Sequence, residues 1–313
     1  MPGVERLHPD EIAIDVDLVR GLVEQSFPHL ASEPVLRSLA SGSSNSIYRL
    51  GNTLAVRLPR QPGGGATIRK EARWLHQLAP QLPTRIPHVL GLGAPGLGYP
   101  EDWSITTWGE GHEPRRRLRG PQSVATGRDL ARFITTLRDA PIPPEAISDP
   151  ALRSYRGEPL QAFDTEFRDL VDECRSLDLD LDLDHALRLW DDAVSAASRL
   201  PPLSTWYHGD LLAENLLLDG NSGLSAVLDF GGLAIGNPLV DLVVAWDLLD
   251  QDGLAAFRVA LAIGDDEWTA ARGWALFLSL MTFPYYRTSM PGRCAARLAL
   301  ARFVLAHGVQ DRA

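Results

Sequence analysis

The pattern of apolar and polar positions divides the chain into a strand-rich first part and a mainly helical remainder. Residues 15–26 carry apolar side chains at positions 16, 18, 19, 22 and 23, which is the spacing of one helix face. Short apolar runs then alternate with turn residues, and the Gly51-Asn52 pair between two of them is typical of a hairpin. The elements predicted in this part are helices at 15–26 and 67–78 and strands at 35–39, 47–50, 53–58, 86–92 and 103–108.

From about residue 120 the apolar positions recur at helical spacing. The helices predicted there cover 122–139, 161–176, 184–199, 239–262, 267–281 and 292–308. Residues 206–230 are the exception, because short apolar runs in this stretch are separated by polar turns. We therefore expect an α+β protein, in which an antiparallel sheet with a helix precedes a larger and mainly helical part.

Composition narrows the class of protein. Of the 313 residues, 45% are hydrophobic and 22% are charged, which is ordinary for a folded globular protein. No run of 18 apolar residues occurs and the N-terminus lacks an apolar secretion signal, so we expect a cytoplasmic protein without membrane contact. The two cysteines, Cys174 and Cys294, have no cysteine near them in sequence and predict neither a disulfide framework nor a zinc site.

The charge balance adds two constraints. The formal net charge of −10 argues against nucleic-acid binding, because nucleic-acid binders carry a basic face. An acidic chain suits a cationic partner, but acidity is also common in soluble proteins. Lys70 is the only lysine among 30 basic residues, so chemistry that needs a lysine must use this one.

The candidate chemistry lies between Tyr207 and Gly231. The sequence YHGDLLAENLLLD places Asp210 and Asn215 five residues apart, and Asp229 begins an Asp-Phe-Gly fourteen residues after Asn215. In phosphoryl transfer one carboxylate orients the attacking hydroxyl, while an amide oxygen and a second carboxylate hold Mg²⁺ against the nucleotide phosphates. Each element alone is common in turns, but the three in this order and spacing predict such a site.

This stretch resembles the aminoglycoside phosphotransferase family, the bacterial antibiotic kinases with a protein-kinase-like fold. Gly209 stands where protein kinases have arginine and the antibiotic kinases have glycine. The segment GNPLVDL, residues 236–242, is similar to the family's Gly-Asp-Pro-x-x-Asp-Leu signature, with Asn237 in place of the usual aspartate. The resemblance implies that Asp241 is a buried support of the catalytic loop; capping a helix N-terminus is its alternative role.

The resemblance also implies a bilobal fold. An N-terminal nucleotide-binding lobe would cover residues 1–107, a C-terminal catalytic and acceptor-binding lobe would cover 108–313, and ATP or GTP would bind between them with Mg²⁺. Asp210 would be the catalytic residue, and Asn215 and Asp229 would hold the metal. His208, which has no His or Cys partner at ligand spacing, is expected to support the loop through hydrogen bonds.

A polar loop in the N-terminal part stands where kinases place the loop that covers the phosphates. Short side chains let backbone N–H groups and hydroxyls approach phosphate oxygens. Most serine-rich hairpins are only turns, so this loop is weak evidence by itself. The residues implied as phosphate contacts are Ser43, Ser44, Asn45 and Ser46.

Arg57 ends a predicted strand at the place where kinases have the lysine that binds the α- and β-phosphates. Glu71 matches the glutamate that pairs with that lysine. Arginine offers a planar fork in place of a point charge, and it can contact both phosphate and Glu71. Lys70 is a rival, but it neighbours Glu71 and is expected to face elsewhere on the helix. A surface ion pair without function is the alternative interpretation of Arg57 and Glu71.

Residues 103–111 resemble the strand and hinge that meet the adenine edge in this family. The resemblance implies contacts with the base near Thr106 and Trp108, although a buried strand followed by a turn fits the same sequence. Residues 91–96 match G-x-G-x-x-G, but Pro95 and the Gly and Pro residues after it prevent the helix that a dinucleotide fingerprint needs. We therefore predict a loop there.

The acceptor is expected to bind the helical lobe beside Asp210, without any one contact residue standing out. Asp247 and Asp250 are candidates for binding an ammonium group, and aromatic rings for stacking, although a solvated surface and a buried core explain the same residue types. The further candidates are Trp246, Trp274, Phe277, Tyr285, Tyr286 and Arg287.

The predicted function is ATP-dependent O-phosphorylation of a small-molecule hydroxyl, and the resemblance makes an aminoglycoside or a related antibiotic the expected acceptor. A metabolic kinase of a sugar, a choline-like amine or a homoserine-like metabolite stays open, because the motif is shared. A nucleotide-binding pseudokinase is a third hypothesis, suggested by Arg57 and Asn237 but opposed by the intact Asp210, Asn215 and Asp229. The oligomeric state stays open.

Overall fold

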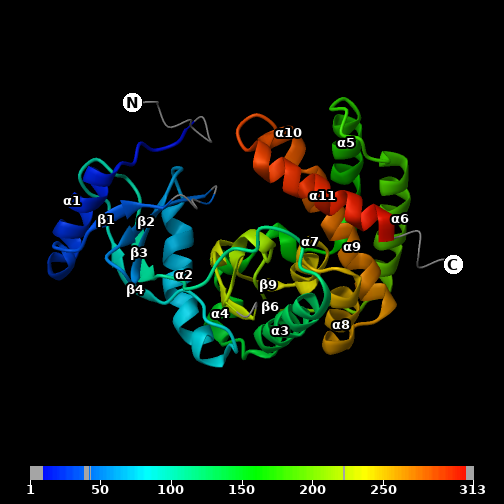
Figure 1. The fold of residues 1–313 in the computed structure, drawn as a ribbon, viewed down its shortest axis with the longest axis horizontal. Coiled ribbons are helices and arrows are strands. Elements are labelled where there is room, and N and C mark those ends of the chain that lie inside the picture. The colour runs from blue at the N-terminus through cyan, green and yellow to red at the C-terminus, as the bar shows by residue number, and fades with distance from the viewer. Residues whose placement is uncertain (1–9, 39–41, 43, 221–222, 308–313) are drawn as a thin grey trace. The chain divides into compact units, whose positions relative to one another are not determined.

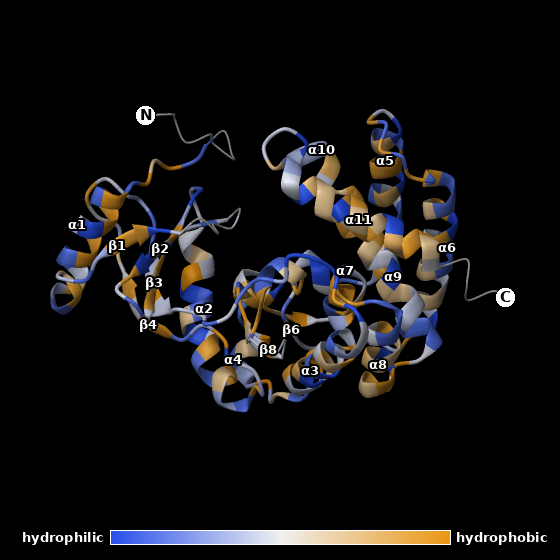
Figure 2. Cartoon of the chain, in the orientation of Figure 1, coloured by the Kyte–Doolittle hydropathy of each residue, from blue (hydrophilic) through white to orange (hydrophobic). Residues whose placement is uncertain are grey.

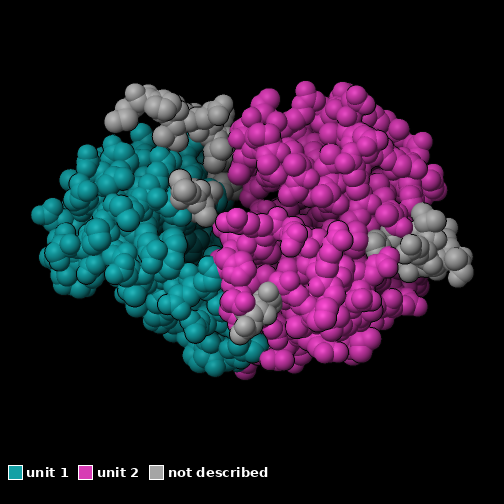
Figure 3. Space-filling model, viewed as in Figure 1, with its two compact units in different colours: residues 1–111, 225–231 teal, residues 112–224, 232–313 magenta. Residues whose placement is uncertain are grey.

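The computed structural model describes residues 10–38, 42, 44–220 and 223–307. Contacts group the chain into two compact units, which Figure 3 draws in two colours. Unit 1 comprises residues 1–111 and 225–231, and unit 2 comprises residues 112–224 and 232–313. The Asp229 segment therefore belongs to unit 1 together with the N-terminal part. The predicted division after residue 107 stays a prediction.

Unit 1 is built on a five-stranded antiparallel sheet with the order β1-β2-β3-β5-β4. The strands are β1 (Val35–Arg37), β2 (Asn45–Leu50), β3 (Leu54–Pro59), β4 (Val89–Gly93) and β5 (Trp103–Thr107). Two helices complete the unit, α1 (Val16–Ser26) and α2 (Gly65–Leu78), and Figure 1 shows α2 beside the sheet. These elements fall close to where the apolar pattern predicts them, but β4 continues to Gly93, so the first half of the loop predicted for residues 91–96 is strand.

Local sequence explains how these elements begin and turn. The Asp15 carboxylate accepts a hydrogen bond from Leu18 N at 2.8 Å and caps the N-terminus of α1. Gly51, between β2 and β3, has a φ of +58°, which glycine adopts without the strain of a side chain. The predicted hairpin therefore forms, and its register pairs Ile47 with Arg57.

The core of unit 1 lies between α1 and the sheet. Two of its large aromatic side chains, Tyr48 and Trp103, are fully buried, and the inner face of α1 packs into the same cluster. Each ring satisfies its polar atom: Tyr48 Oη donates to Ile14 O, and Trp103 Nε1 donates to Ala94 O, both at 3.1 Å. In Figure 2 the strands of this sheet show hydrophobic colours interrupted by hydrophilic ones.

Unit 2 is mainly helical. Its helices are α3 (Gly120–Asp139), α4 (Pro144–Ile147), α5 (Asp164–Arg175), α6 (Leu183–Arg199), α7 (Val243–Leu248), α8 (Gln251–Leu261), α9 (Asp265–Leu280), α10 (Thr282–Tyr286) and α11 (Pro291–His307). Strands β6 (Thr205–Tyr207) and β9 (Ala234–Gly236) pair antiparallel, and β7 (Leu216–Leu218) also lies in this unit. Strand β8 (Leu224–Val227) lies mostly in unit 1.

Helix α9 forms the centre of unit 2. Every residue from Ala270 to Leu280 is buried, and the rings of Trp274 and Phe277 contact Phe163 with centroids 5.3 Å away. Trp190 of α6 stacks on Phe167 of α5 at 4.0 Å. Rings packed this closely stabilise the fold by burying apolar surface and by favourable stacked or edge-to-face contacts between the rings. These aromatic side chains are core.

The structure corrects one predicted helix. Residues 239–262 form three pieces, the 3₁₀ helix Pro238–Leu242, α7 and α8, and not one helix. The break has a local cause, because Leu249 is extended and the carboxylate of Asp250 caps α8 by accepting from Gly253 N at 3.0 Å. In the part of the chain that the structure describes, no helix is long and apolar enough to cross a membrane.

Candidate active site

The loop of residues 208–215, here called the catalytic loop, follows β6 through a sharp turn at Gly209. Gly209 has a φ of +83°, which side-chain-bearing residues rarely adopt. A Cβ built on Gly209 would lie 2.3 Å from the carbonyl oxygen of Gly232, so neighbouring backbone would have to move. The position thus needs glycine for two separate reasons.

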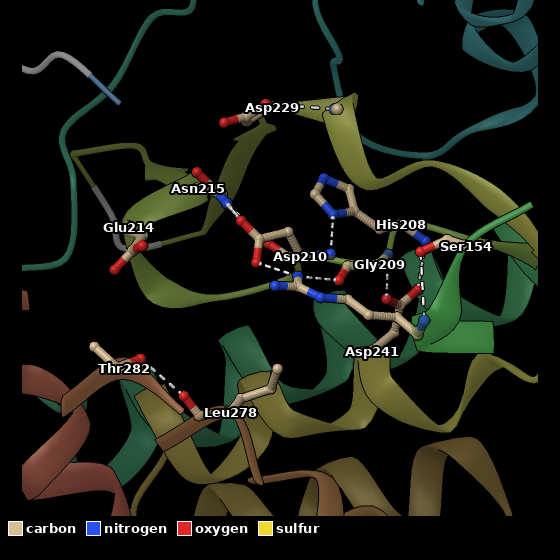
Figure 4. Close-up of polar contacts among 12 residues, drawn as sticks. Ser154, His208, Gly209, Asp210, Glu214, Asn215, Asp229, Asp241, Leu278 and Thr282 are labelled. Carbon is tan, nitrogen blue, oxygen red and sulfur yellow. Dashed lines mark hydrogen bonds and ion pairs between the residues drawn. The ribbon is translucent and has the colours of Figure 1, made fainter. Parts of the chain in front are cut away.

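Asp241 holds the backbone of this turn. Its side chain is 1% exposed, and its two carboxylate oxygens accept from His208 N at 2.7 Å and from Gly209 N at 2.8 Å (Figure 4). The helix cap nearby is made by another residue, because the Asn237 side chain accepts from Leu239 N at 3.1 Å. Asp241 is therefore the buried support of the catalytic loop, and Asn237 has the capping role.

Asp210 is fixed by its own loop. The side-chain amide of Asn215 donates to the Asp210 carbonyl oxygen at 2.8 Å and to Asp210 Oδ2 at 3.1 Å (Figure 4). The main-chain N–H of Asp210 donates to Nδ1 of the fully buried His208 at 3.2 Å. The structure thus brings Asp210 and Asn215 together as the sequence predicts, and His208 supports the loop through hydrogen bonds.

Arg156 is the neighbour of Asp210 that sequence reasoning missed. Its Nη1 donates to Asp210 Oδ1 and to the Gly209 carbonyl oxygen, both at 2.6 Å. Burial raises the pKa of Asp210, but Arg156, with smaller contributions from His208 and Arg297, lowers it more, so this carboxyl ionises below its ordinary range. The result is a carboxylate held in its charged form with both oxygens engaged.

The segment that carries Arg156 is the 3₁₀ helix Tyr155–Gly157. It is tied to the β6–β9 pair, because Asn237 N donates to the Gly157 carbonyl oxygen at 3.0 Å. A Cβ on Gly157 would lie 2.6 Å from Tyr207 Oη, so the close approach also depends on glycine. No motif marks this segment. Because 29 of the 30 lysine and arginine residues of the chain are arginines, an arginine at position 156 does not by itself indicate a function.

Helix α11 holds the other end of the catalytic loop. Glu214 accepts from Arg293 at 2.8 Å through Oε1 and from Arg297 at 3.0 Å through Oε2. Asp247, at the end of α7, accepts from Ala213 N at 2.8 Å and lies 3.7 Å from Arg297 Nη1. The loop is therefore anchored at its start by Asp241 and at its end by α11.

Within unit 1, Arg57 of β3 and Glu71 of α2 form the expected ion pair. Both guanidinium ends donate to the Glu71 carboxylate, and the two side chains are only 7% and 1% exposed. Burial lowers the pKa of Arg57, but Glu71 and Asp229 raise it more, so the guanidinium stays charged. Because the pair is buried, a plain surface ion pair does not describe it.

Asp229 lies beside this pair in unit 1. Its Oδ1 is 3.5 Å from Arg57 Nη2 and accepts from Gly231 N at 3.3 Å, and its backbone has a φ of +57°. Lys70 turns to the same segment and donates from Nζ to the Gly231 carbonyl oxygen at 2.7 Å. Lys70 thus supports the Asp-Phe-Gly turn, while Arg57 occupies the place expected for the phosphate-binding cation.

Gly42, which precedes β2, lies near Asp229 within unit 1. A Cβ built on Gly42 would lie 3.8 Å from Asp229 Oδ2. Ser44 is exposed, whereas Asn45 and Ser46 are 6% and 3% exposed and already belong to β2. Ser43 lies outside the described residues. Their phosphate contacts stay predictions, for which exposed Ser44 has the better placed hydroxyl.

The hinge residues lie in and after β5. Thr106 is 2% exposed and pairs with Ala55 of β3 and Val89 of β4. Trp108 donates its main-chain N–H to the Thr53 carbonyl oxygen at 2.7 Å, so this donor is engaged within unit 1. Contacts of Thr106 and Trp108 with a nucleotide base stay predictions.

Asn215 and Asp229, each considered within its own unit, carry an oxygen atom that suits a hard cation. Among the described residues no donor contacts Asn215 Oδ1, and Asp229 is 33% exposed with its Oδ2 clear of Arg57. Amide and carboxylate oxygens are the ligands that Mg²⁺ takes in nucleotide sites. Asn215 belongs to unit 2 and Asp229 to unit 1. No group of three or more His, Cys, Asp or Glu side chains in the described ranges could hold a metal by itself.

Comparison with known proteins identifies the family. The model of a family described as "Phosphotransferase enzyme family" matches residues 35–274, which include the catalytic loop, the Arg57–Glu71 pair and Asp229. The chain belongs to this phosphotransferase family. No curated protein matches the sequence significantly.

Solved structures of phosphotransferases share the fold. The GDP complex of a wild-type aminoglycoside 2'-phosphotransferase-IIIa superposes with a TM-score of 0.71 at 17% identity, over 94% of this chain and 100% of that one. A macrolide 2'-phosphotransferase type I gives 0.64 at 18% identity, over 92% and 97%. The apoenzyme of a macrolide 2'-phosphotransferase from Brachybacterium faecium gives 0.62 at 17% identity, over 93% and 97%. The predicted protein-kinase-like α+β fold and the predicted class of enzyme, a small-molecule phosphotransferase, are confirmed.

The structure removes most of the acceptor contacts that the sequence suggested. Trp246, Trp274 and Phe277 are at most 1% exposed and pack in the core. Asp247 and Asp250 serve main-chain N–H groups, at Ala213 and at Gly120 and Gly253 respectively. Tyr285, which is 59% exposed, and its neighbours Tyr286 and Arg287 keep surface that a ligand could reach.

Proposed function

We propose that this phosphotransferase moves the γ-phosphoryl group of ATP, or of GTP, to a hydroxyl of a small molecule of the antibiotic type. The observation that carries the proposal is the Asp210 carboxylate, held charged by Arg156 and fixed by Asn215 within the family's own loop. Nucleotide use is supported by relatives of the same fold whose structures are GDP and ADP complexes. An antibiotic-type acceptor is supported by relatives that are aminoglycoside and macrolide phosphotransferases.

Asp210 has the role of orienting the attacking group. The acceptor hydroxyl donates its hydrogen bond to the carboxylate, its oxygen forms a bond to the γ-phosphorus, and the bond from that phosphorus to the β,γ-bridging oxygen breaks. The hydroxyl proton passes by way of Asp210 to solvent, and the products are a phosphate monoester and the nucleoside diphosphate. Because the pKa of Asp210 is lowered, the carboxylate is ready to accept at neutral pH.

Asn215 and Asp229 are the residues that would hold Mg²⁺, which supplies positive charge to the nucleotide phosphates. Asn215 can do so through Oδ1, since its Nδ2 is already engaged by Asp210. Arg57 binds the phosphates and is kept in place and charged by Glu71. Ser44 contacts the phosphates, and the segment with Thr106 and Trp108 contacts the base.

The test is Mg²⁺-dependent release of ADP or GDP with a panel of acceptors. The panel comprises aminoglycosides, macrolides, simple sugars, choline and homoserine. We expect release that depends on both acceptor and Mg²⁺, and a loss of about 10²- to 10⁴-fold in Asp210→Asn with nearly unchanged nucleotide binding. Asp252→Asn, at the exposed start of α8, is the matched control.

The outcomes separate the hypotheses. Full activity of Asp210→Asn would contradict the assigned role of this carboxylate. Turnover of a sugar, choline or homoserine alone would identify a metabolic kinase with the same chemistry. Binding of Mg-nucleotide without turnover of any acceptor would favour a nucleotide-binding pseudokinase. No nucleotide binding at all would contradict the proposed enzyme and that alternative together.

A further inference from the structure

One face of helix α2 lies against the Asp-Phe-Gly turn within unit 1. A Cβ built on Gly231 would lie 3.4 Å from Thr67 Cγ2 and 3.9 Å from Glu71 Oε1. Lys70, on the same helix, donates from Nζ to the Gly231 carbonyl oxygen at 2.7 Å. Because residues three and four apart share a helix face, Thr67, Lys70 and Glu71 meet the turn together.

The direction of Lys70 differs from the one expected from its place beside Glu71. Neighbouring residues of a helix point about 100° apart, which is why Lys70 was expected to face elsewhere. The long and flexible stem of a lysine bridges that angle, and its ammonium reaches the turn that Glu71 also faces. The only lysine of the chain is thus engaged next to Asp229.

The backbone of Asp229 is in a conformation that needs support. Its φ of +57° is uncommon for a residue with a side chain, and such a conformation persists only where the surroundings enforce it. Within unit 1 the Asp229 carboxylate accepts from Gly231 N at 3.3 Å and lies 3.5 Å from Arg57 Nη2, and both distances are long. The 2.7 Å bond from the Lys70 ammonium is the shortest and strongest of these three contacts.

The phosphate-binding cation does not depend on Lys70. Arg57 is held by its own two hydrogen bonds to the Glu71 carboxylate. Loss of the Lys70 ammonium therefore leaves that pair in place and loosens the Asp-Phe-Gly turn. The effect expected of Lys70 is on Asp229 and not on the contacts of Arg57 with phosphate.

We propose that Lys70 is a positioning residue for the metal site: by holding the Gly231 carbonyl, it keeps Asp229 in the conformation that binds Mg²⁺ with the nucleotide. The proposal rests on the proposed function, since it assumes that Asp229 holds Mg²⁺. It gives the only lysine of this chain a task other than phosphate binding, which belongs to Arg57.

The test measures metal affinity through nucleotide binding, without turnover. A fluorescent ADP or GDP is titrated into the full chain at increasing Mg²⁺, and again in EDTA without Mg²⁺. Lys70→Met keeps a long side chain but has no donor, and it should raise the half-saturating Mg²⁺ concentration roughly 10- to 100-fold. Nucleotide binding in EDTA should stay unchanged, because Arg57 and Glu71 are untouched.

Three further variants separate positioning from plain structural support. Lys70→Arg keeps a cationic donor and should raise the half-saturating Mg²⁺ concentration less than Lys70→Met does. Arg69→Met removes an equal charge from the adjacent position of α2, where the exposed Arg69 pairs with Asp102, and should change nothing. Lys70→Gln, shorter and neutral, should repeat the effect of Lys70→Met. Thermal unfolding in EDTA checks the fold of each variant.

Three results would overturn the proposal. The first is an unchanged half-saturating Mg²⁺ concentration in folded Lys70→Met or Lys70→Gln. The second is an equal shift in Lys70→Met and Arg69→Met, which would show that Lys70 only fastens α2. The third is unfolding of both neutral Lys70 variants, which would make the lysine a requirement of the fold. Failure of the proposed function looks different, because Mg²⁺ would then not tighten nucleotide binding by the unaltered chain.

Discussion

Arg156 and Asp210 are 54 residues apart in sequence, and a guanidinium N–H of the first donates to a carboxylate oxygen of the second at 2.6 Å. The same Nη1 also donates to the Gly209 carbonyl oxygen, so Arg156 fixes both the side chain and the backbone of the turn. Asp210 therefore receives its orientation from a segment outside the motif that contains it.

Replacement of Arg156 should lower turnover without weakening nucleotide binding. A hydrogen bond to a charged group contributes about 1.5–3 kcal/mol, which corresponds to roughly 10- to 100-fold in kcat. We expect Arg156→Ala to lose that factor and Arg156→Lys to lose less, because lysine keeps the charge but not the fork. Steady-state kinetics at saturating nucleotide measure this loss of kcat. A kcat of Arg156→Ala within twofold of the parent would refute the positioning role of Arg156.

The buried pair of Arg57 and Glu71 should matter for stability as well as for nucleotide binding. Removing one partner of a buried ion pair leaves an uncompensated charge and costs about 3–5 kcal/mol. Glu71→Ala should therefore lower the free energy of unfolding by about that amount, as measured by urea denaturation. An exposed control is Glu110→Ala, whose pair with Arg85 is 79% and 74% exposed and should contribute at most about 1 kcal/mol.

Substitutions at Arg57 itself should rank in a definite order. Arg57→Lys keeps a positive charge near Glu71 but replaces the two-ended guanidinium with a single ammonium group. The KM of this variant for the nucleotide should therefore rise moderately. Arg57→Ala removes the charge and should raise the nucleotide KM further. Equal KM values for Arg57→Ala and the parent would show that this arginine supports structure alone.

Gly209→Ala should disrupt the catalytic loop. A left-handed backbone costs a side-chain-bearing residue about 1–2 kcal/mol, and the overlap with the Gly232 carbonyl oxygen adds roughly 1–3 kcal/mol. We expect a lower melting temperature together with a large loss of turnover. Gly220→Ala is the matched control, because nothing lies within 4 Å of its Cβ position and its φ is not in the left-handed range.

The two cysteines should differ in reactivity. Burial raises the pKa of Cys174 to about 12, and its side chain is 1% exposed; burial also raises the pKa of Cys294, which is less deeply placed. At pH 8 the Cys174 thiol is therefore almost entirely protonated, and its thiolate fraction rises with pH. Iodoacetamide should therefore label Cys294 slowly and Cys174 only after denaturation. Rapid labelling of Cys174 in the folded protein at pH 8 would contradict its placement.

The site elements that sequence anticipates are those fixed by local spacing. Asp210 and Asn215 share one loop, and Arg57 and Glu71 lie on a strand and the helix directly after it, so pattern and order place them. Asp241 is also foreseen as a support, through the segment that surrounds it. In the pairs Asp210–Asn215 and Arg57–Glu71 the backbone between the residues is short enough to limit where the side chains meet. Asp241 lies 33 residues from His208, and only the family resemblance of its segment indicated its role.

The contacts that sequence does not anticipate are long-range pairs of ordinary residues. Arg293 and Arg297 lie on a helix whose apolar spacing predicts only a buried face, and nothing in that spacing names Glu214 as their partner. The break after α7 is missed for a related reason: Leu248 and Leu249 continue the apolar pattern, and only the cap made by Asp250 ends the helix.

The anchoring of Glu214 by α11 determines which contact of the catalytic loop is the last to become available as the chain is synthesised. The partners of this residue are made 79 and 83 residues after it, later than every motif of the catalytic chemistry. Contacts of such separation form late in folding, because the chain between them must first be closed into a loop. A nascent chain that ends before Arg293 would carry Asp210, Asn215 and Asp229 and still lack the anchor that α11 provides at Glu214.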